Sequence, residues 1–387
     1  MDSHAGVPAK YSSNIIPPHL SMKISCEREK FSQAFQLVAS VAAAKDVKPV
    51  LQNVKISTTK KNVLLQATDT EIGIRLHLDG CEVQAKGDAV LPTKVFKKML
   101  QESTEPMLLI ESEQEKVHVS GAKGRLYGFP TQSADEFPDV EDFSAASYHE
   151  VSTKVLREII RRTVFAIDTE HNRYNLDGVL LEFIEDKIIG VATDGKRLAF
   201  QEGTAQCVGD HKAENTIFPA KALHILERSL GSDDEVVQVS VSTNRALFRC
   251  GNVVFFTRLV EGRFPRWRTI IPETEGKVQI DVLAGALNTA VRQAAIVTSE
   301  RQPGVIFSFS SGKLVLNAHG AELGDASIEV PLSYSGDEQN VKLDPKFFTD
   351  YLRVFESEKN LSIYISGDDP IHIRTDDAYI YVVMPMS

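Results

Sequence analysis

The tripeptide Ala-Thr-Asp follows an apolar run twice in this chain, at residues 67–69 and at residues 192–194. The two copies lie 125 residues apart, and 125 residues further on another apolar run leads into Asn317-Ala318-His319. A period of this length is the size of a domain and is too long for one unit of a solenoid. The spacing therefore predicts that one domain is written three times within 387 residues.

Predicted helices recur at nearly the same spacing. Apolar residues at steps of three and four predict one amphipathic helix early in each copy, at 27–45, 153–167 and 281–299. A second helix is expected later in each copy, at 91–100, 218–230 and 342–355. Each second helix has proline at or just before its first turn, where the missing N–H is not needed.

Alternating runs between the helices predict antiparallel strands, as at 179–183, 236–241 and 361–367. Each copy also closes on an apolar strand, at 125–130, 253–260 and 378–386. Residues 1–21 lack a basic start and a long apolar segment, so they are interpreted as a flexible extension and not as a signal peptide. The predicted fold class is α+β, with three repeated domains at 22–145, 148–272 and 276–387.

Composition favours a soluble globular protein, with 42% hydrophobic and 25% charged residues. No window approaches 18 consecutive apolar residues, so no transmembrane helix is expected. The ten histidines form no convincing H-x-x-x-H pair, and neither a metal site nor another cofactor is expected. The four cysteines are far apart in sequence and indicate reduced thiols in a cytoplasmic protein: Cys26, Cys81, Cys207 and Cys250.

Positive charge is concentrated on the predicted helices, although the whole chain has a net charge of −10. The six helical segments carry a net +9, so the rest of the chain carries −19. Lysine and arginine are common on solvated helices, which is one interpretation. The other is that three copies present basic helices to one shared space and hold a polyanion through its phosphates, without reading bases.

Four sequence segments in combination with the threefold repeat carry a resemblance to a known family: FAIDTEHNRYNLDGVLLEF, VATDGKRLA, LVEGRFPRW and the terminal YVVMPM. Over residues 22–387 the chain resembles the β subunit of bacterial DNA polymerase III, the sliding clamp. The resemblance implies a head-to-tail homodimer whose six domains close a ring around duplex DNA, with helices inside and sheets outside. It also implies a protein of the bacterial cytoplasm and nucleoid that has no catalytic residues and tethers the replicative polymerase, the clamp loader and repair proteins.

In that family a pocket between the second and third domains takes short linear motifs of partner proteins. The resemblance implies that one half of this pocket comprises Arg173, Leu176, Thr193, Gly195, Lys196, Arg197, Leu198, Pro265 and Ile270. The other half would comprise Asp344, Phe347, Pro370, Val382, Val383, Met384, Pro385 and Met386. Aliphatic walls with flexible methionines can accept several peptide sequences, which a shared binding site needs.

The family also implies a DNA-facing surface and a dimer interface. The basic residues expected to face DNA are Lys45, Lys94, Lys97, Lys98, Lys154, Arg157, Arg161 and Arg301. The apolar contacts expected between subunits are Ile296 and Val297, meeting the strand near Leu126. Two features depart from the family pattern: the chain stops at Ser387 where a basic residue is often found, and the loop 168–171 is less suited to touching DNA.

Plainer interpretations exist for single motifs. Thr193-Asp194-Gly195 is by default a tight turn in which the aspartate accepts backbone N–H groups. Trp267 is expected to be partly exposed in interface packing, and the terminal apolar run is by default an ordinary edge strand.

Two alternative functions remain open. A two-metal nuclease would use carboxylates such as Asp69 and Glu71 together with the pairs 368–369 and 376–377, but these belong to turns of different copies. A scaffold that binds proteins and not DNA is disfavoured by the net charge of +9 on the helices. The sequence does not decide between a dimer and a trimer.

Overall fold

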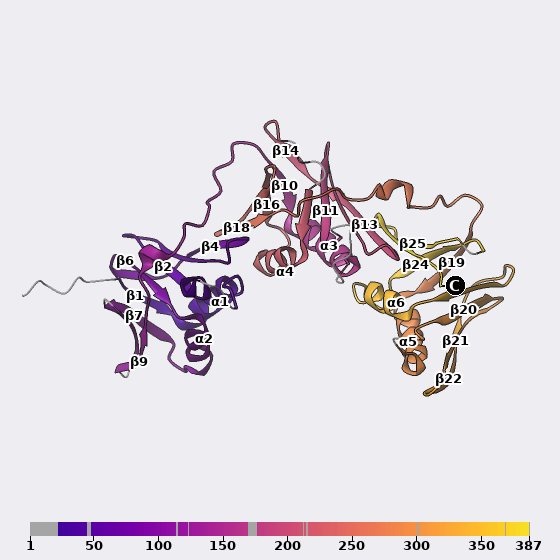
Figure 1. The fold of residues 1–387 in the computed structure, drawn as a ribbon, viewed down its shortest axis with the longest axis horizontal. Helices are drawn as coiled ribbons and strands as arrows, with labels where there is room; N and C mark the ends of the chain where they lie inside the picture. Colours follow the sequence, from indigo (N-terminus) through magenta and orange to yellow (C-terminus); the bar gives the residue numbers. More distant parts are fainter. Residues whose placement is uncertain are drawn as a thin grey trace, which may run out of the picture. The chain divides into compact units, whose positions relative to one another are not determined.

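The computed structural model describes residues 22–44, 48–113, 115–122, 124–168, 176–211, 213, 216–299, 302–367 and 369–386. The chain divides into two compact units, residues 1–140 and 141–387. The first unit contains one copy of the repeat and the second contains the other two (Figure 1). The prediction of an α+β fold with a threefold repeat is confirmed.

The first unit packs two helices against two antiparallel sheets. Its helices are α1 (Arg28–Ala39) and α2 (Thr93–Glu102), with short 3-10 turns η1 (Pro49–Gln52) and η2 (Ala134–Glu136). Its strands are β1 (Lys23–Glu27), β2 (Val54–Thr58), β3 (Val63–Thr68), β4 (Ile72–Leu78), β5 (Glu82–Ala85), β6 (Gly87–Leu91), β7 (Met107–Glu113), β8 (Lys116–Gly121) and β9 (Gly124–Pro130). The strand orders are β5-β1-β7-β8-β9 and β4-β3-β2-β6.

Aromatic rings join the two helices of the first unit. Helix α1 packs against α2, and the rings of Phe31, Phe35 and Phe96 lie 5.1–6.1 Å apart between them. All three side chains are fully buried. Because these residues come from one face of each helix, the amphipathic periodicity of the sequence is sufficient to specify this contact.

The second unit contains the second and third copies. The second copy comprises β10 (Tyr148–Ser152), α3 (Thr153–Thr163), η3 (Val164–Ala166), β11 (Gly178–Ile184), β12 (Lys187–Thr193), β13 (Arg197–Thr204), β14 (Gln206–Val208), β15 (Thr216–Pro219), α4 (Ala220–Ser229), β16 (Val236–Val241), β17 (Arg245–Cys250) and β18 (Val253–Arg258). The third comprises β19 (Val278–Leu283), α5 (Ala284–Ala294), η5 (Ala295–Val297), β20 (Val305–Ser310), β21 (Lys313–Gly320), β22 (Gly324–Pro331), β23 (Gln339–Leu343), α6 (Pro345–Leu352), β24 (Asn360–Ile365), β25 (Ile371–Arg374) and β26 (Tyr379–Val383). A linker with the short turn η4 (Trp267–Thr269) joins the two copies.

One sheet in the second unit is built from both of its copies. The strand order β15-β11-β12-β13-β26-β25-β24-β19 places four strands of the second copy beside four of the third. The strands β14-β10-β16-β17-β18 and β22-β21-β20-β23 form the outer parts of the two copies. Within each copy the two helices pack against each other, α3 with α4 and α5 with α6 (Figure 1).

Several predicted helices are too long. The first was expected to reach residue 45 but ends at Ala39, where the Ser40 hydroxyl donates 2.6 Å to the Leu37 carbonyl and competes with the helical hydrogen bond. Residues 281–283 and 342–343 end strands β19 and β23 instead of beginning helices. Helix α6 begins only at Pro345, because the Asp344 side chain caps it by accepting the Lys346 N–H at 2.8 Å.

The first Ala-Thr-Asp forms a turn between β3 and β4. The Asp69 carboxylate accepts the backbone N–H groups of Glu71 at 3.0 Å and Ile72 at 2.7 Å. The hydroxyl of Thr68 donates to the Ile72 carbonyl at 2.8 Å. Asp69 therefore has a local structural role. In a two-metal nuclease site its carboxylate would bind a metal ion instead of the backbone of its own turn.

The second Ala-Thr-Asp forms the same turn between β12 and β13. The Asp194 carboxylate accepts the N–H groups of Lys196 at 2.9 Å and Arg197 at 3.0 Å, and Thr193 donates to the Arg197 carbonyl at 2.6 Å. The turn interpretation of this motif is confirmed. The motif recurs because a strand, an Asx turn and a return strand recur.

The third copy departs from this pattern. Residues 317–319 lie inside β21, which runs on to Gly320, and the chain turns only at 321–323. His319 faces Asp325 across the hairpin, with Nδ1 and Oδ1 2.5 Å apart. The third copy lacks the Thr-Asp pair, and β21 therefore runs two residues further than β3 and β12 do before the chain turns.

None of the described helices has the length and the hydropathy needed to cross a membrane.

The two equivalent turns share one left-handed backbone position but place different residues there. Thr70 has φ +76° and Gly195 has φ +85°, a region that costs an L-residue roughly 1–2 kcal/mol. We expect Gly195→Thr to lower the free energy of unfolding by about 1 kcal/mol, as measured by urea unfolding with the fluorescence of Trp267, the single tryptophan. Thr70→Gly, in the first unit, is the reciprocal control; when unfolding is followed by circular dichroism, its midpoint should be unchanged or raised. Destabilisation by Thr70→Gly would contradict this account of the turn.

Candidate functional site

The pairing of β13 with β26 brings together two stretches that the sequence analysis assigned to one pocket. In this antiparallel register Leu198 lies opposite Val382, and Arg197 lies opposite Val383. The backbone continues the contact past the strand, because the Met384 N–H donates to the Lys196 carbonyl at 2.9 Å. Some residues of each predicted half of the pocket therefore lie on adjacent strands of one sheet.

A closed apolar layer covers one face of this sheet. Leu198 and Val382 are each only 1% exposed, and Trp267 of the linker packs on the same layer with its ring 5.2 Å from that of Phe200. The buried members of the layer are Leu180, Ile189, Val191, Leu198, Phe200, Ile217, Trp267 and Val382. The linker thus lies over the sheet and shields the two central aliphatic side chains from solvent.

The expectation that Trp267 is partly exposed is wrong. Its side chain is 6% exposed, because the linker folds into η4 directly over the sheet. The guanidinium of Arg268 covers the indole at 4.1 Å and also contacts the Glu182 carboxylate at 2.8 Å. This cation-π and ion-pair arrangement holds the linker against the sheet.

Other predicted pocket residues keep apolar surface exposed. Ile270 is 39% exposed and Met384 is 44% exposed, while Pro265, Pro385 and Met386 are half-buried. The terminal segment is fixed by the Met386 N–H, which donates to the Lys342 carbonyl at 2.8 Å. Exposed methionine and isoleucine side chains beside a buried aliphatic layer are suited to receive an apolar peptide side chain.

The side chain of Arg197 connects the second copy to the third through hydrogen bonds and ion pairs. Its Nε donates to Asp194 at 2.9 Å and its Nη2 to the Phe165 carbonyl at 2.8 Å, both within the second copy. Its Nη1 donates to Asp350 of α6 at 2.9 Å, and its guanidinium lies 4.8 Å from the ring centre of Phe347. Because the side chain is only 6% exposed, it is a buried structural cation and not a free group for a ligand.

Phe347 and Asp344 are held by the same junction. The Tyr381 hydroxyl of β26 donates to the Phe347 carbonyl at 2.9 Å, and the Tyr351 ring stacks on that of Tyr381 at 4.5 Å. Asp344 is the N-cap of α6. Phe347 therefore joins helix α6 to the shared sheet, whereas Asp344 caps the helix.

The remaining predicted pocket residues are placed by local structure. Leu176 is 7% exposed, and its carbonyl accepts the Asp168 N–H at 2.8 Å. Thr193, Gly195 and Lys196 form the turn after β12, and Pro370 is half-buried before β25. Arg173 lies outside the described residues.

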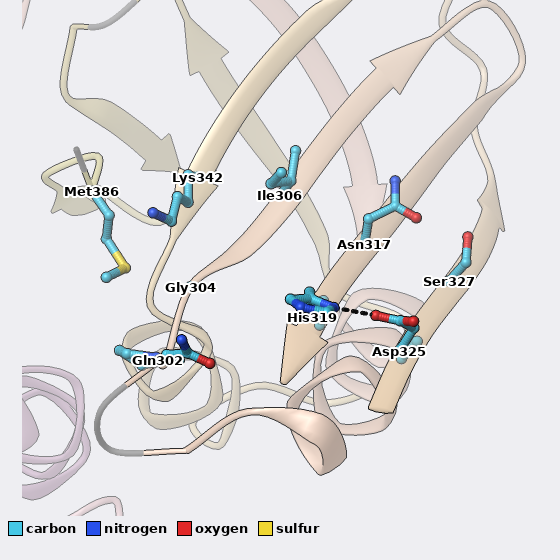
Figure 2. A pocket seen from close by; sticks show the side chains of 12 residues that line it. Gln302, Gly304, Ile306, Asn317, His319, Asp325, Ser327, Lys342 and Met386 are labelled. Atoms are coloured by element: carbon cyan, nitrogen blue, oxygen red, sulfur yellow. Dashed lines mark hydrogen bonds and ion pairs between the residues drawn. The ribbon is translucent and has the colours of Figure 1, made fainter. Parts of the chain in front are cut away.

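A second hollow lies on the outer face of the β22-β21-β20-β23 sheet and has a volume of about 700 Å³. Figure 2 shows Met386 and Lys342 at one end of it and the His319–Asp325 pair at the other. Ile306, which is 44% exposed, lies between them. Met386 thus belongs to the wall of this hollow, which the sequence did not indicate.

The predicted DNA-facing residues fall into two groups. Lys94, Lys97 and Lys98 on α2 and Lys154 on α3 are exposed. Arg157 is half-buried; it pairs with Asp233 and donates to the Gly231 carbonyl at 2.7 Å, and the exposed Arg161 pairs with Glu227 at 2.5 Å. The two arginines therefore already have acidic partners. Lys45 and Arg301 lie outside the described residues.

The predicted subunit contacts are found on η5. Ile296 is 73% exposed and Val297 is half-buried. Near them Leu323, which no sequence pattern indicated, is 58% exposed and lines a hollow with Val297 and Gly320. A β-carbon at position 320 would collide with the Val297 carbonyl, so this glycine allows η5 to pack directly on the hairpin. The backbone of Leu126 lies in β9, and its side chain is outside the described part of the structure.

The repeated fold is found in solved structures of DNA polymerase sliding clamps. A sliding clamp from Bacillus subtilis superposes with a TM-score of 0.87 over 95% of this chain and 99% of the other, at 24% identity. A sliding clamp from Pseudomonas aeruginosa, solved bound to griselimycin, gives 0.86 over 95% and 100% at 27% identity. These likenesses define the class, a DNA sliding clamp.

Sequence comparison gives the particular family. The beta sliding clamp of Chlamydia pneumoniae is 29% identical over 366 residues, which cover 94% of this chain and 99% of the relative. Family models described as the N-terminal, central and C-terminal domains of DNA polymerase III beta subunit match residues 22–141, 150–266 and 268–387. The chain belongs to the DNA polymerase III beta subunit family.

Arg197 should be required for the junction of the second and third copies. Replacing it by methionine leaves two carboxylates facing each other, and breaking a buried pair in this way costs about 3 kcal/mol. We expect Arg197→Met to lower the free energy of unfolding by about that amount, measured by urea unfolding with Trp267 fluorescence. Arg353→Met is the matched control, because Arg353 contacts the same Asp350 at 3.3 Å with a side chain that is 71% exposed. An equal effect of the two variants would contradict the role given to Arg197.

His372 should make stability depend on pH. This side chain lies opposite Val382 in the sheet and is fully buried, and neither ring nitrogen has a hydrogen-bond partner among the described residues. Burial, with Arg374 and Lys277 nearby, lowers the pKa of His372 to about 4. Because the folded pKa lies below the unfolded value of about 6.5, stability is complete above that pH and is lost as the pH falls towards 4.

We expect His372→Phe to reduce this loss, by about 2 kcal/mol, between pH 7 and pH 4.5 in urea unfolding experiments. Phenylalanine preserves the stacking on Tyr364, whose ring lies 4.8 Å away. His224→Gln, on an exposed position of α4, is the control and should leave the profile unchanged. His149 and His211 should still contribute pH dependence in this variant, because burial also lowers the pKa of His149, to about 4, and the pKa of His211. If His372→Phe leaves the dependence of stability on pH unchanged, His372 is not the source of the loss at low pH.

Proposed function

We propose that this chain is a sliding clamp that closes as a head-to-tail homodimer around duplex DNA and tethers the replicative polymerase, without catalysis of its own. The observation that carries the proposal is that each unit has a sheet that ends in a strand available for pairing with another subunit. In the described strand orders β9 ends one sheet of the first unit, and β22 ends the outer sheet of the third copy. Pairing β9 of one subunit with β22 of the next would cover both of these edges and close the ring.

Apolar side chains accompany both ends. Tyr127 on β9 is 39% exposed, and beside β22 Leu323 and Ile296 are 58% and 73% exposed. Large exposed apolar side chains gathered at a strand edge are typical of an interface between subunits. Each joint would be heterologous, because β9 of one subunit meets β22 of the other, and two identical joints would close the dimer.

The exposed lysines support contact with DNA phosphates. Lys94, Lys97 and Lys98 lie on α2, the second helix of the first copy, and Lys154 lies at the start of α3, the first helix of the second copy. Lysines that hold phosphates without base contacts favour sequence-independent binding that weakens with salt. Such binding suits a protein that moves along duplex DNA, in the bacterial cytoplasm and at the nucleoid.

The shared sheet supports the binding of partner peptides. A peptide leucine or phenylalanine would contact Ile270, Pro265 and Met384, next to the layer that Trp267 covers. Burial of one such side chain contributes roughly 1.5–3 kcal/mol, so two or three give micromolar affinity after ordering costs. Deeper entry, towards Leu198 and Val382, requires Trp267 to move. Polymerase, clamp loader and repair proteins would compete for this one surface.

Encirclement has a direct test. The wild-type protein should sediment at twice the chain mass of 42.8 kDa and, after assembly by a clamp loader, stay on nicked circular DNA but leave it once the circle is cut. The double variant Ile296→Asp with Val297→Asp should be monomeric and retained on neither DNA, because charge would be buried at the joint.

Ile184→Asp provides the matched control, since Ile184 is 40% exposed at the end of β11 and should not affect assembly. Equal retention of the wild type on circular and linear DNA would contradict encirclement. Dimers that bind peptides but never remain on circles would favour the alternative of a protein scaffold.

Removing the four residues after β26 should separate tethering from ring closure. Val383 must be kept, because it is fully buried and pairs with Arg197 and Ile371. Deletion of residues 384–387 should leave the dimer on circular DNA, weaken binding of a leucine- and phenylalanine-containing peptide at least about tenfold, and abolish processive synthesis. Fluorescence anisotropy and primer extension measure these effects.

Ile306→Ala, in the neighbouring hollow of the third copy, is the control for that deletion. It should leave peptide affinity unchanged. Peptide binding that survives the deletion would show that the terminal methionines are not part of the site.

A further inference from the structure

Two cysteines that are 55 positions apart in sequence face each other in the first unit. Strand β1 pairs with β5 in an antiparallel register that places Ile24 opposite Val83 and Ser25 opposite Glu82. The next step of this register places Cys26 opposite Cys81. Directly opposed residues of an antiparallel pair have Cα atoms about 4.5 or 5.5 Å apart, and both spacings lie within the range that a disulfide requires.

Both thiols point to the same face of the sheet. On β1 the buried residues are Ile24 and Cys26, and on β5 the exposed residues are Glu82 and Gln84, so positions 81, 83 and 85 face inward. Cys26 is 1% exposed and Cys81 is half-buried. The two thiols are in hydrogen-bonding contact. Since β5 is a four-residue strand that ends its sheet, it can adjust to a covalent bond at small cost.

We propose that Cys26 and Cys81 are a site of reversible oxidation, at which a peroxide converts the two thiols into an intramolecular disulfide. The hydrogen bond with Cys26 lowers the pKa of Cys81, and the hydrogen bond with Cys81 together with burial raises the pKa of Cys26. Cys81 is thus the thiol that ionises more readily and meets solvent, and Cys26 is the thiol that ionises less readily behind it.

The reaction balances in two steps. The Cys81 thiolate attacks hydrogen peroxide, the O–O bond breaks, and Cys81 becomes a sulfenic acid as hydroxide leaves. The Cys26 sulfur then attacks the Cys81 sulfur, an S–S bond forms, and the sulfenic oxygen leaves as water with the Cys26 proton. Two thiols are oxidised by two electrons and one peroxide is reduced, and a dithiol reductant reverses the change by exchange.

The other two cysteines do not share this geometry. Cys207 is exposed on β14 and contacts the carbonyls of Gly209 and His211 at 3.6 Å. Cys250 is buried on β17 and contacts the Glu235 carboxylate at 3.5 Å. Neither lies opposite another cysteine in the described registers. Oxidation should therefore remove two of four thiols and spare the other two.

The test is peptide mapping of the native full-length protein after treatment with hydrogen peroxide and alkylation. We expect the tryptic peptides 24–28 and 76–86 to be joined, with two hydrogens fewer than their sum, and free thiols to fall from four to two. Dithiothreitol should restore all four. A Cys81 sulfinic acid with Cys26 still free would overturn the proposal.

Variants assign the two roles. In Cys26→Ala and Cys26→Ser, Cys81 should stop at a sulfenic acid that dimedone traps, and in Cys81→Ser the oxidation of Cys26 should be lost. Cys207→Ser is the matched control and should form the cross-link at the wild-type rate. Circular dichroism confirms folding, and a Cys26 that is oxidised equally fast without Cys81 would contradict the assigned order.

Discussion

The pairing of β13 with β26 is the interaction on which the second unit depends. It converts two copies of a domain into one eight-stranded sheet and places residues about 185 positions apart side by side. Arg197 reinforces the pairing with two carboxylates and two aromatic rings, which come from both copies. A peptide bound at this junction, as proposed above, would contact side chains supported by a paired sheet, which reduces the ordering cost of binding.

The sequence predicted what depends on local periodicity. Six helices, the closing strands and the Asx turns at Asp69 and Asp194 follow from patterns within a dozen residues. The ends of helices were less predictable, because Ser40 and Asp344 act through single side-chain hydrogen bonds. Burial of Trp267 was missed for another reason: a linker has no periodicity that shows which surface it will cover.

Long-range partners were also beyond the sequence. Nothing near Arg197 indicates Asp350, and the ion pair exists only because α6 packs beside β26. The same holds for Arg157 and Arg161, which were expected to meet DNA but contact Asp233 and Glu227. A count of charges along a helix therefore overestimates the charge available to a polyanion, and Lys94, Lys97 and Lys98 are better candidates because they are exposed.

The position of β26 has a consequence for synthesis of the protein. This strand is synthesised long after β13, yet it lies in the interior of the eight-stranded sheet, between β13 and β25. During synthesis β13 must therefore wait with an open edge until β26 has left the ribosome. The first unit can fold while the rest is being made, whereas the second and third copies become one body only once β26 has emerged.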